Sequence, residues 1–263
     1  MGSKKTCLGC DVGALATKTV ILRNGTIIGV NIALNEGRMG QAIEESISRA
    51  LEMAKLSVED IEYRGGTGWG ERYIPFPHLS TSVISSLALG AHWACPDAHT
   101  IIDIGGLSST AILMNDAGRV LEYRANDRCA AGTGFFLELA AQAMELDVEA
   151  LCPKAFCATE RAHISAQCAV FGESEIVSHL NEGEDVSSIA SGIAYAVASG
   201  AATILQRLEV QPELLVTGGV AKNLSVIKAL EESLGMKTSE ISSDPQILGA
   251  VGTALLAREK TQE

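Results

Sequence analysis

The chain carries Gly9-Cys10-Asp11-Val12-Gly13 near its start and Ile102-Asp103-Ile104-Gly105-Gly106 about 90 residues later. Each stretch ends an apolar run with an aspartate and a glycine turn, which is typical of a buried strand closed by a tight turn. The predicted strands are Lys5–Asp11, Lys18–Arg23, Thr26–Leu34, Ile61–Arg64, Thr100–Ile104, Ser109–Met114, Val120–Ala125 and Leu214–Thr217. The same unit of strand, turn, strand, hairpin and strand occurs twice, which predicts an α/β protein with two related subdomains.

Helices are expected after each set of strands, where apolar residues recur at a spacing of about 3.6 residues. In the first of these helices, Ile43, Ile47 and Leu51 share one face. The expected helices cover residues 41–56, 82–92, 134–145, 170–180, 187–208, a segment from about 223, and 245–257. These elements predict a first subdomain at 1–95, with the C-terminal helix 244–263 packing back onto it, and a second subdomain at 96–243.

The composition narrows the classes of function. Of the 263 residues, 47% are apolar but only 4% are aromatic, so the cores must consist mainly of Ala, Ile, Leu and Val. A net charge of −12 disfavours nucleic acid and anionic membranes as partners. The apolar run Gly192–Leu205 contains Ser199 and is expected to form a buried helix, not a membrane span. Seven cysteines without a secretion signal predict reduced thiols and a cytoplasmic location.

The two Asp-x-Gly turns predict a phosphate-binding cleft. Ligands of α/β sheets bind at the carboxyl ends of strands, where glycine lets backbone N–H groups approach phosphate oxygens closely. Asp11 and Asp103 are the expected catalytic residues, because a carboxylate at each turn can hold Mg²⁺ through water and orient the attacking water. The run Val216-Thr217-Gly218-Gly219-Val220-Ala221 also follows a strand and is expected to contact the purine or the ribose. The predicted nucleotide-binding residues are Gly13, Ala14, Thr17, Lys18, Gly105, Gly106, Gly132, Thr133, Gly218, Gly219, Val220 and Asn223.

Any one of these motifs is more often an ordinary turn than a ligand site. The two Asp-x-Gly turns and the run 216–221 are followed by a run of small residues, Gly249-Ala250-Val251-Gly252-Thr253-Ala254, and the four motifs are considered together. In this order they resemble the phosphate, adenosine and connecting motifs of the actin, hexokinase and heat-shock-protein ATPases. The resemblance implies the actin-like (ribonuclease H-like) ATPase fold, in which ATP is bound between two related α/β subdomains.

Two cysteines stand where helices are expected to begin. Cys129 lies within Asn126-Asp127-Arg128-Cys129-Ala130-Ala131-Gly132-Thr133-Gly134, and Cys168 follows 39 residues later. A helix start favours a thiolate, and its free N–H groups can donate hydrogen bonds to cluster sulfides. A [4Fe–4S] cluster needs four thiolates, so a two-fold dimer with Cys129 and Cys168 from each chain would hold one cluster per dimer.

Two other interpretations of these cysteines stay open. Cys129 and Cys168 could be buried apolar residues without any ligand. A single chain could instead bind metal through Cys129, Cys152, Cys157 and Cys168. The segment 152–157 is expected to be a loop without a close Cys-x-x-Cys pair, which makes the single-chain site the weaker of the metal hypotheses.

The remaining cysteines and the histidines are expected to be structural. Cys7 and Cys10 lie three residues apart in a predicted strand, so they face opposite sides and belong to the core. Cys95 is interpreted in the same way. No metal-ligand spacing connects the five histidines, most of which are expected at the surface or at helix caps: His78, His92, His99, His163 and His179.

The resemblance becomes specific at the cysteine motifs. The chain carries Cys129-Ala-Ala-Gly-Thr-Gly followed by Phe136-Leu137-Glu138, then Cys168-Ala-Val-Phe-x-Glu-Ser-Glu and Val216-Thr-Gly-Gly-Val-Ala-Lys-Asn. Over nearly its whole length it is similar to the activator component of 2-hydroxyacyl-CoA dehydratases, a family that also includes the ATPase subunits of benzoyl-CoA reductase. The resemblance implies a homodimer, or a heterodimer with a related subunit, that holds one [4Fe–4S] cluster and binds ATP or ADP with Mg²⁺. It also implies a ferredoxin or flavodoxin as electron donor, and an iron–sulfur enzyme that accepts one low-potential electron when ATP is hydrolysed.

Four departures from the family pattern concern the nucleotide. Ala14-Leu15 stands where the family usually has Ser-Thr, and Leu107-Ser108 stands where it usually has Gln-Asp. Leu87-Ala88 replaces His-Ala, and Phe135 replaces an arginine. These changes bear on the rate of ATP hydrolysis more than on nucleotide binding. They predict a divergent branch, either one subunit of a heterodimer or an activator of another partner, such as a double-cubane cluster protein.

Two other functions are compatible with the same fold. A small-molecule kinase, for instance for an amino sugar, would need a carboxylate base beside the γ-phosphate, but Leu107-Ser108 occupies its usual place. A nucleotide-binding regulatory subunit with little ATPase activity would tolerate the same departures. The cysteine pair distinguishes an electron-transfer activator from both.

Overall fold

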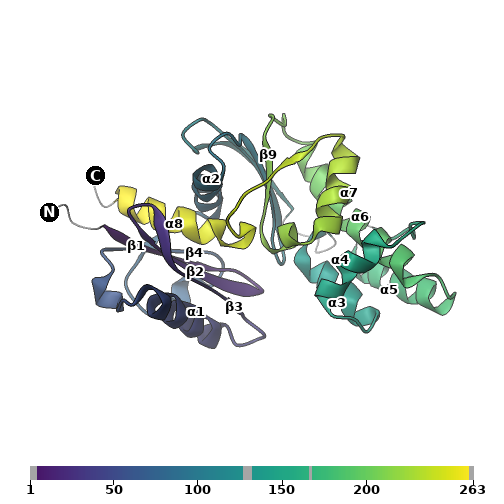
Figure 1. Cartoon of the computed structure of the whole chain (residues 1–263), viewed down its shortest axis with the longest axis horizontal. Helices are drawn as coiled ribbons and strands as arrows, with labels where there is room; N and C mark the ends of the chain where they lie inside the picture. Colours follow the sequence, from purple (N-terminus) through teal and green to yellow (C-terminus); the bar gives the residue numbers. More distant parts are fainter. Residues whose placement is uncertain (1–4, 127–131, 166–167, 261–263) are drawn as a thin grey trace. The chain divides into compact units, whose positions relative to one another are not determined.

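The computed structural model describes residues 5–126, 132–165 and 168–260, and these residues divide into two compact units. Unit 1 comprises residues 5–99, 114–121 and 241–260, and unit 2 comprises 100–113, 122–126, 132–165 and 168–240. Each unit is built around one five-stranded sheet (Figure 1). The subdomain limits expected from the sequence, at 95/96 and 243/244, remain a prediction.

The sheet of unit 1 has the strand order β3-β2-β1-β4-β5. Its strands are β1 (Thr6–Val12), β2 (Ala16–Arg23), β3 (Thr26–Leu34), β4 (Tyr63–Thr67) and β5 (Leu79–Ser80). The first three strands are antiparallel neighbours, whereas β4 runs parallel to β1 and β5 runs parallel to β4. The β2–β3 turn has positive φ at both Asn24 (53°) and Gly25 (83°), a conformation that favours an Asn-Gly pair.

The sheet of unit 2 repeats this topology. Its strands are β6 (Thr100–Ile104), β7 (Ser109–Met114), β8 (Val120–Asn126), β9 (Leu214–Thr217) and β10 (Thr238–Ser239). The strand order is β10-β9-β6-β7-β8. Counted from the opposite edge, it equals the order of the first sheet, with β6 in the place of β1 and β9 in the place of β4. β7 is antiparallel to β6 and β9 is parallel to it. The predicted duplication is therefore confirmed, although the two-residue edge strands β5 and β10 were not expected.

Helices cover both faces of the first sheet. They are α1 (Met39–Ala54), α2 (Val83–Ala94) and α8 (Leu248–Lys260). Side chains of β1 alternate between the faces, so that Leu8 and Cys10 pack in the core that includes α1, and Cys7 packs in the core that includes α8. Figure 1 shows α1 and α8 on opposite sides of these strands.

The contacts of α8 depend on glycine. A Cβ atom on Gly252 would lie 1.8 Å from the carbonyl oxygen of Ser86, and one on Gly90 would lie 1.9 Å from a backbone oxygen of α8. A Cβ atom on Gly9 of β1 would lie 2.0 Å from the carbonyl oxygen of Ala250. The run of small residues therefore lets the backbone of α8 approach both α2 and β1.

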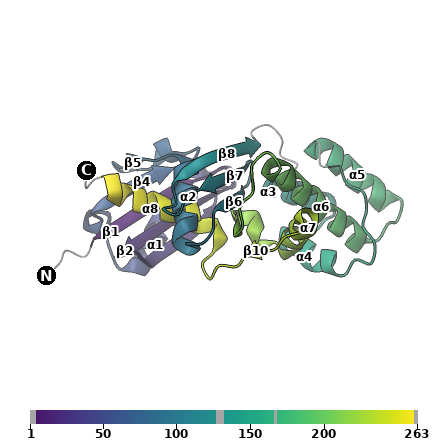
Figure 2. The ribbon, with the colours of Figure 1, turned by 90° about the horizontal axis from the view of Figure 1, so that it is seen from above.

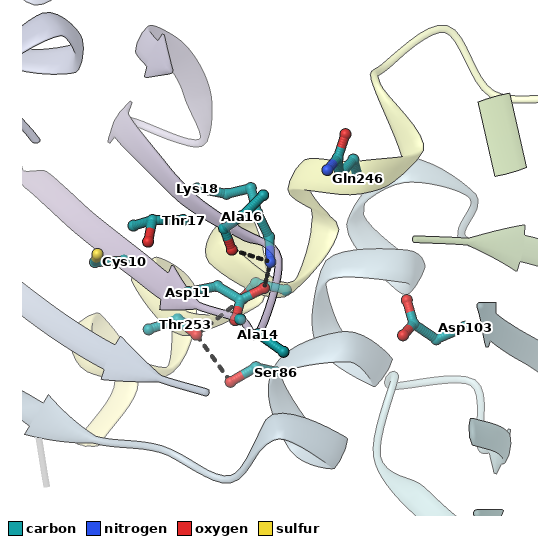
Figure 3. Close-up of polar contacts among 12 residues, drawn as sticks. Cys10, Asp11, Ala14, Ala16, Thr17, Lys18, Ser86, Asp103, Gln246 and Thr253 are labelled. Atoms are coloured by element: carbon teal, nitrogen blue, oxygen red, sulfur yellow. Dashed lines mark hydrogen bonds and ion pairs between the residues drawn. The ribbon is translucent and has the colours of Figure 1, made fainter. Parts of the chain in front are cut away.

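A buried hydroxyl cluster lies at the same contact. Thr253 Oγ1 is 2.9 Å from Ser86 Oγ, which is in turn 2.9 Å from Thr81 Oγ1. These three side chains join α8, α2 and the segment after β5, and Figure 3 shows the Thr253–Ser86 pair. Because each hydroxyl has a partner, the close packing does not leave a buried polar group unsatisfied.

The helices of unit 2 pack around one long central helix. They are α3 (Gly134–Ala143), α4 (Val148–Phe156), α5 (Ala169–Asn181), α6 (Val186–Leu205) and α7 (Leu224–Leu234). Figure 2 shows α4, α6 and α7 side by side. Short 3-10 helices occur at Val58–Asp60, Glu71–Tyr73, Gly219–Lys222 and Pro245–Ile247.

The central helix α6 explains the apolar run noted in the sequence. By length and composition alone α6 could cross a membrane, but 72% of its most apolar window is buried inside the structure. Ile189, Ile193 and Val197 on this helix are at most 1% exposed and belong to the core of unit 2. The expectation of a buried helix is confirmed.

Two expectations were wrong. Residues 152–157, expected as a loop, lie in α4 and at its C-terminal cap. The helix was hard to foresee because Pro153 lies inside it and Leu151 is its only buried residue, so the apolar periodicity is weak. Cys95, expected in the core, is only half-buried, because it forms the C-terminal cap of α2.

The close contact of α8 predicts the effect of one added methyl group. Gly252→Ala is expected to lower the free energy of unfolding by about 1–3 kcal/mol, because overpacking outweighs the gain in helix propensity. The midpoint of urea unfolding, followed by circular dichroism, measures the change. Gly40→Ala in α1 is the control, since nothing lies within 4 Å of a Cβ atom at that position. Equal midpoints for the two variants would contradict the argument.

Candidate functional site

Asp11 lies near the end of β1, beside a lysine of the neighbouring strand. Its carboxylate is 2.7 Å from Lys18 Nζ, and the two side chains are 15% and 12% exposed. The pair forms because Asp11 and Lys18 lie opposite each other in the β1–β2 register. Figure 3 shows the ammonium group between the carboxylate and the carbonyl oxygen of Ala16. A side chain on Gly13 would meet this ammonium group, since a Cβ atom there would lie 2.9 Å from Lys18 Nζ.

The turn that follows β1 is fixed by Asn35, which is 5% exposed. The side-chain Nδ2 of Asn35 donates to the carbonyl oxygens of Gly13 (2.9 Å) and Ala14 (2.8 Å). Its Oδ1 accepts a hydrogen bond from Thr17 Oγ1 (3.0 Å), and its backbone N–H donates to Leu15 (2.8 Å). The fully buried hydroxyl of Thr17 thus faces Asn35, which suggests that Thr17 supports the turn indirectly.

Asp103 is the counterpart of Asp11 in β6. Its Oδ1 accepts a hydrogen bond from the hydroxyl of Thr217 in β9 (2.9 Å), the residue opposite it in the register. Gly218 follows with φ of 87°, and a Cβ atom there would lie 2.4 Å from the carbonyl oxygen of Ile104. Only glycine fits this position without strain, and it brings the third glycine element against the aspartate turn.

The turn after β6 is bonded to the start of α3. The backbone N–H of Gly105 donates to the carbonyl of Ser108 (2.9 Å) and closes the turn. The N–H groups of Gly134 and Phe135 then donate to the carbonyl oxygens of Gly105 (2.9 Å) and Gly106 (2.8 Å). Two helix donors that would otherwise lack partners are thereby satisfied by the turn.

The residues just before α3 are packed on α6. A Cβ atom on Gly132 would lie 3.2 Å from the Cα atom of Gly200, and the carbonyl oxygen of Gly132 accepts a hydrogen bond from Ser109 Oγ (2.7 Å). Thr133 occupies the N-cap position of α3 and is fully buried. Glycine at 132 therefore serves close packing of this segment against the helix.

The third glycine element leads into a short helix. Gly219 begins the 3-10 helix Gly219–Lys222, and Val220 is 4% exposed in the core of unit 2. The side-chain oxygen of Asn223 accepts hydrogen bonds from the N–H groups of Ser225 (3.1 Å) and Val226 (3.3 Å), which caps α7.

Cys168 stands directly before α5, as expected. It is half-buried, in extended backbone (φ −150°, ψ 130°), and its carbonyl oxygen accepts a hydrogen bond from the N–H of Gly172 (2.9 Å). Beside it, α5 exposes Val170 (64%), Phe171 (65%) and Val177 (44%). Cys129 lies outside the described residues, so its pairing with Cys168 stays a prediction.

The other candidate metal ligands do not converge. Cys152 is half-buried in α4, and Cys157 is exposed at its C-terminal cap. Within residues 5–126, 132–165 and 168–260, no three His, Cys, Asp or Glu side chains lie close enough to hold a metal ion. Cys152, Cys157 and Cys168 are all within these ranges, which argues against the single-chain metal site.

Cys7 and Cys10 are core residues, as predicted. Burial raises the pKa of Cys7 to about 11 and that of Cys10 to about 12. The two thiols also pack in different cores on opposite faces of β1. They are therefore neither a redox pair nor a metal pair in this fold.

The structure gathers the expected nucleotide residues into two sets. The set around Asp11 in unit 1 is Gly13, Ala14, Thr17 and Lys18. The set that shares unit 2 with Asp103 is Gly105, Gly106, Gly132, Thr133, Gly218, Gly219, Val220 and Asn223. Asn35 was not expected, because an asparagine just after a strand is ordinarily a turn residue and nothing in the sequence connects it to Gly13.

Two sheets of equal topology, each with an Asp-x-Gly turn at the end of its central strand, give the chain the actin-like fold. Residues 8–257 match the model of the BadF/BadG/BcrA/BcrD ATPase family. The chain belongs to this family.

Similar proteins cover nearly the whole chain. It is 38% identical to the activator of lactoyl-CoA dehydratase from Anaerotignum propionicum, over 97% of this chain and 98% of that protein. The crystal structure of component A of (R)-2-hydroxyglutaryl-CoA dehydratase from Acidaminococcus fermentans is 37% identical, with a TM-score of 0.91 over 98% of this chain and 99% of that one. The activator of 2-hydroxyisocaproyl-CoA dehydratase from Clostridium difficile, solved with bound ADPNP, is 32% identical, with a TM-score of 0.92 over 98% and 96% of the chains.

The thiol environments predict which cysteines react. At about pH 8, iodoacetamide should alkylate Cys157 in the native protein and leave Cys7 and Cys10 unmodified, because thiols with pKa values of about 11 and 12 are almost wholly protonated there. Mass spectrometry of tryptic peptides measures the modified fraction at each site. The same reaction in denaturant should label all three. Equal labelling of Cys10 and Cys157 in the native protein would show that the core position is wrong.

Proposed function

We propose that this protein is an ATP-dependent activator that passes one low-potential electron to an iron–sulfur partner enzyme, such as a 2-hydroxyacyl-CoA dehydratase. The observation that carries the proposal is the hydrogen bonding of Gly105 and Gly106 to Gly134 and Phe135, because it joins a candidate nucleotide turn to the helix after the Cys129 motif. The relatives described above as activators of dehydratases support it.

In this proposal, ATP and Mg²⁺ bind at the turns that follow β1 and β6. Lys18 offsets phosphate charge, and backbone N–H groups of both turns donate to phosphate oxygens. The Asp11 and Asp103 carboxylates would be the residues that hold Mg²⁺ through water and orient the attacking water. The partial exposure of the Asp11–Lys18 pair fits this role, since both charged groups can reach a ligand.

Cys129 and Cys168 are the proposed ligands of a [4Fe–4S] cluster. Cys168 fits, because its half-buried thiol stands at the start of α5, where N–H groups can donate to sulfur. One chain supplies two thiolates, and a second copy related by a two-fold axis supplies the other two. When bound, the cluster supplies one-electron redox chemistry.

The dimer would be formed in part by α5. Val170, Phe171 and Val177 are exposed on α5, the helix that begins after Cys168, and association of two copies would remove these side chains from water. A related but different subunit would satisfy the same requirement, so that a benzoyl-CoA-reductase-type heterodimer is the alternative arrangement.

A contiguous path supports coupling between nucleotide and cluster within unit 2. Phe135 is bonded to the turn at Gly106, and the neighbouring Phe136 is fully buried. A Cβ atom on Gly172 of α5 would lie 2.8 Å from the Phe136 ring, and Gly172 is bonded to Cys168. Movement of the turn would therefore press α3 against the helix that carries the ligand. Each 1.4 kcal/mol transmitted in this way would change the potential for one electron by about 59 mV.

The partners follow from this cycle. A reduced ferredoxin or flavodoxin would supply the electron in the cytoplasm, and the iron–sulfur acceptor enzyme would dock on the dimer. The half-exposed Leu107 stands at the second turn without a carboxylate, so ATP turnover without the acceptor is expected to be slow. The same feature keeps a nucleotide-binding regulatory subunit as the second candidate function, because regulation needs binding but little hydrolysis.

The cluster predicts a specific iron content. After anaerobic reconstitution the protein should contain about two iron atoms per chain, because a four-iron cluster is shared by two chains. Cys168→Ser should reduce the iron to near zero and shift the protein towards monomer in size-exclusion chromatography. The Cys152→Ala/Cys157→Ala double variant is the matched control and should keep its iron. Loss of iron in this control would instead favour a single-chain site.

The aspartates predict the loss of ATP hydrolysis. Asp11→Asn and Asp103→Asn should each lower the rate of phosphate release by about 100-fold or more, because water is no longer oriented by a carboxylate. Phosphate release is measured with the reduced cluster and an acceptor protein present. Asp116→Asn is the control, since the Asp116 side chain is 98% exposed and its carboxylate lies 2.9 Å from His99 Nε2, at the turn between β7 and β8. Undiminished turnover in Asp103→Asn would remove this residue from the catalytic set.

A further inference from the structure

Three successive carbonyl groups of the turn after β1 point at one residue. The carbonyl oxygens of Gly13 and Ala14 accept from the side chain of Asn35, and that of Leu15 accepts from its backbone N–H. In a planar trans peptide, the carbonyl of one residue and the N–H of the next point in opposite directions. The N–H groups of Ala14 and Leu15 therefore point away from Asn35.

These N–H groups form an unused row of donors. Across the described parts of the chain, neither the Ala14 nor the Leu15 N–H has a hydrogen-bond partner. Successive N–H groups in a tight turn make an anion-binding concavity. Lys18 adds a positive charge beside the turn, 2.9 Å from the position of a Cβ atom on Gly13. Because alanine and leucine carry no side-chain donor, the turn can bind an anion only through its backbone and this lysine.

We infer that Asn35 is a positioning residue for the nucleotide, which holds the turn so that the N–H groups of Ala14 and Leu15 face the phosphates. The inference rests on the proposed nucleotide binding and names a residue that this function depends on. Asn35 does not touch the ligand, because the residue is only 5% exposed. Its side-chain amide already makes hydrogen bonds with Gly13, Ala14 and Thr17.

Thr17 sets the orientation of the asparagine amide. Its hydroxyl donates to Asn35 Oδ1 (3.0 Å), which places the amide oxygen on the side of Thr17 and leaves both Nδ2 hydrogens for Gly13 and Ala14. Aspartate at position 35 would present a carboxylate oxygen to two carbonyl oxygens, and the turn would be repelled. A protonated aspartate, in contrast, could donate one hydrogen bond.

The test is isothermal titration calorimetry of the full chain with Mg-ATP and with AMP. Asn35→Asp should weaken ATP binding about tenfold or more at about pH 8. The variant loses the hydrogen bonds to the carbonyl oxygens of Gly13 and Ala14, and these bonds aim the backbone N–H groups at the phosphate charge. Affinity should recover in part as the pH is lowered towards about 4, the ordinary pKa of an aspartate carboxyl, because the protonated form can donate one hydrogen bond. AMP binding should change less than ATP binding, because AMP carries one phosphate group in place of three and offers the turn fewer oxygen atoms. Asn115→Ala, which removes an asparagine from another turn, is the matched control.

Steady-state ATP hydrolysis separates positioning from a purely structural role. Asn35→Ala should raise the KM for ATP while kcat at saturating ATP stays within about twofold of the parent. Thr17→Val should weaken ATP binding about threefold without changing side-chain volume, and it decides the question if the Asn35 variants do not fold. ATP affinity unchanged in Thr17→Val and in a folded Asn35 variant would overturn the inference. Failure of the unmodified protein to bind ATP would refute the proposed function itself.

Discussion

In both units, the turn after the central strand is fixed through its carbonyl oxygens. Asn35 supplies the donors for the turn after β1, and the first N–H groups of α3 supply them for Gly105 and Gly106 after β6. Since carbonyl and N–H groups alternate in direction along a peptide, fixing the carbonyls aims the intervening N–H groups to the opposite side. Two unrelated sets of donors thus produce the same constraint in each half of a duplicated fold.

The parts of this arrangement that are local in sequence could be predicted. An apolar run that ends in Asp-x-Gly indicates a buried strand and a turn, and Asn24-Gly25 indicates the hairpin that joins β2 to β3. Repetition of this pattern predicted the three antiparallel strands of each sheet, but not the two-residue edge strands β5 and β10. The bonds of Asn35 could not be predicted, because it lies 22 residues from Gly13 and a side-chain amide at a strand end has many possible partners. The direction of the Thr17 side chain could not be predicted either, because the sequence does not show which neighbour a hydroxyl near a turn will face. A nucleotide-binding role for Thr17 stays a prediction.

For the cysteines too, some features could be predicted from the sequence and others could not. Strand alternation was sufficient to place Cys7 and Cys10 on opposite faces, and their burial and raised pKa values agree with a core role. The helix start at Cys168 was predictable from the apolar pattern of α5. For α4, Pro153 and a single buried side chain left no periodic signal, so the environment of Cys152 was interpreted wrongly. Local sequence patterns thus predicted where a residue lies in a strand or at a helix start, but they did not predict which groups surround its side chain.

The different donors in the two units have a consequence for the proposed mechanism. The turn after β1 is held by a side chain whose other bonds, to Thr17 and Leu15, return to the same hairpin, so a change there stays local. The turn after β6 is held by α3, whose Phe136 packs on Gly172 of the helix that begins at Cys168. In the proposed mechanism, loss of a phosphate from the first turn would affect only the contacts of Asn35. Loss of a phosphate from the second turn would affect a chain of contacts that reaches Cys168, a proposed cluster ligand. Conversion of nucleotide hydrolysis into strain at the metal centre is therefore expected to proceed through unit 2, with unit 1 serving to hold the nucleotide.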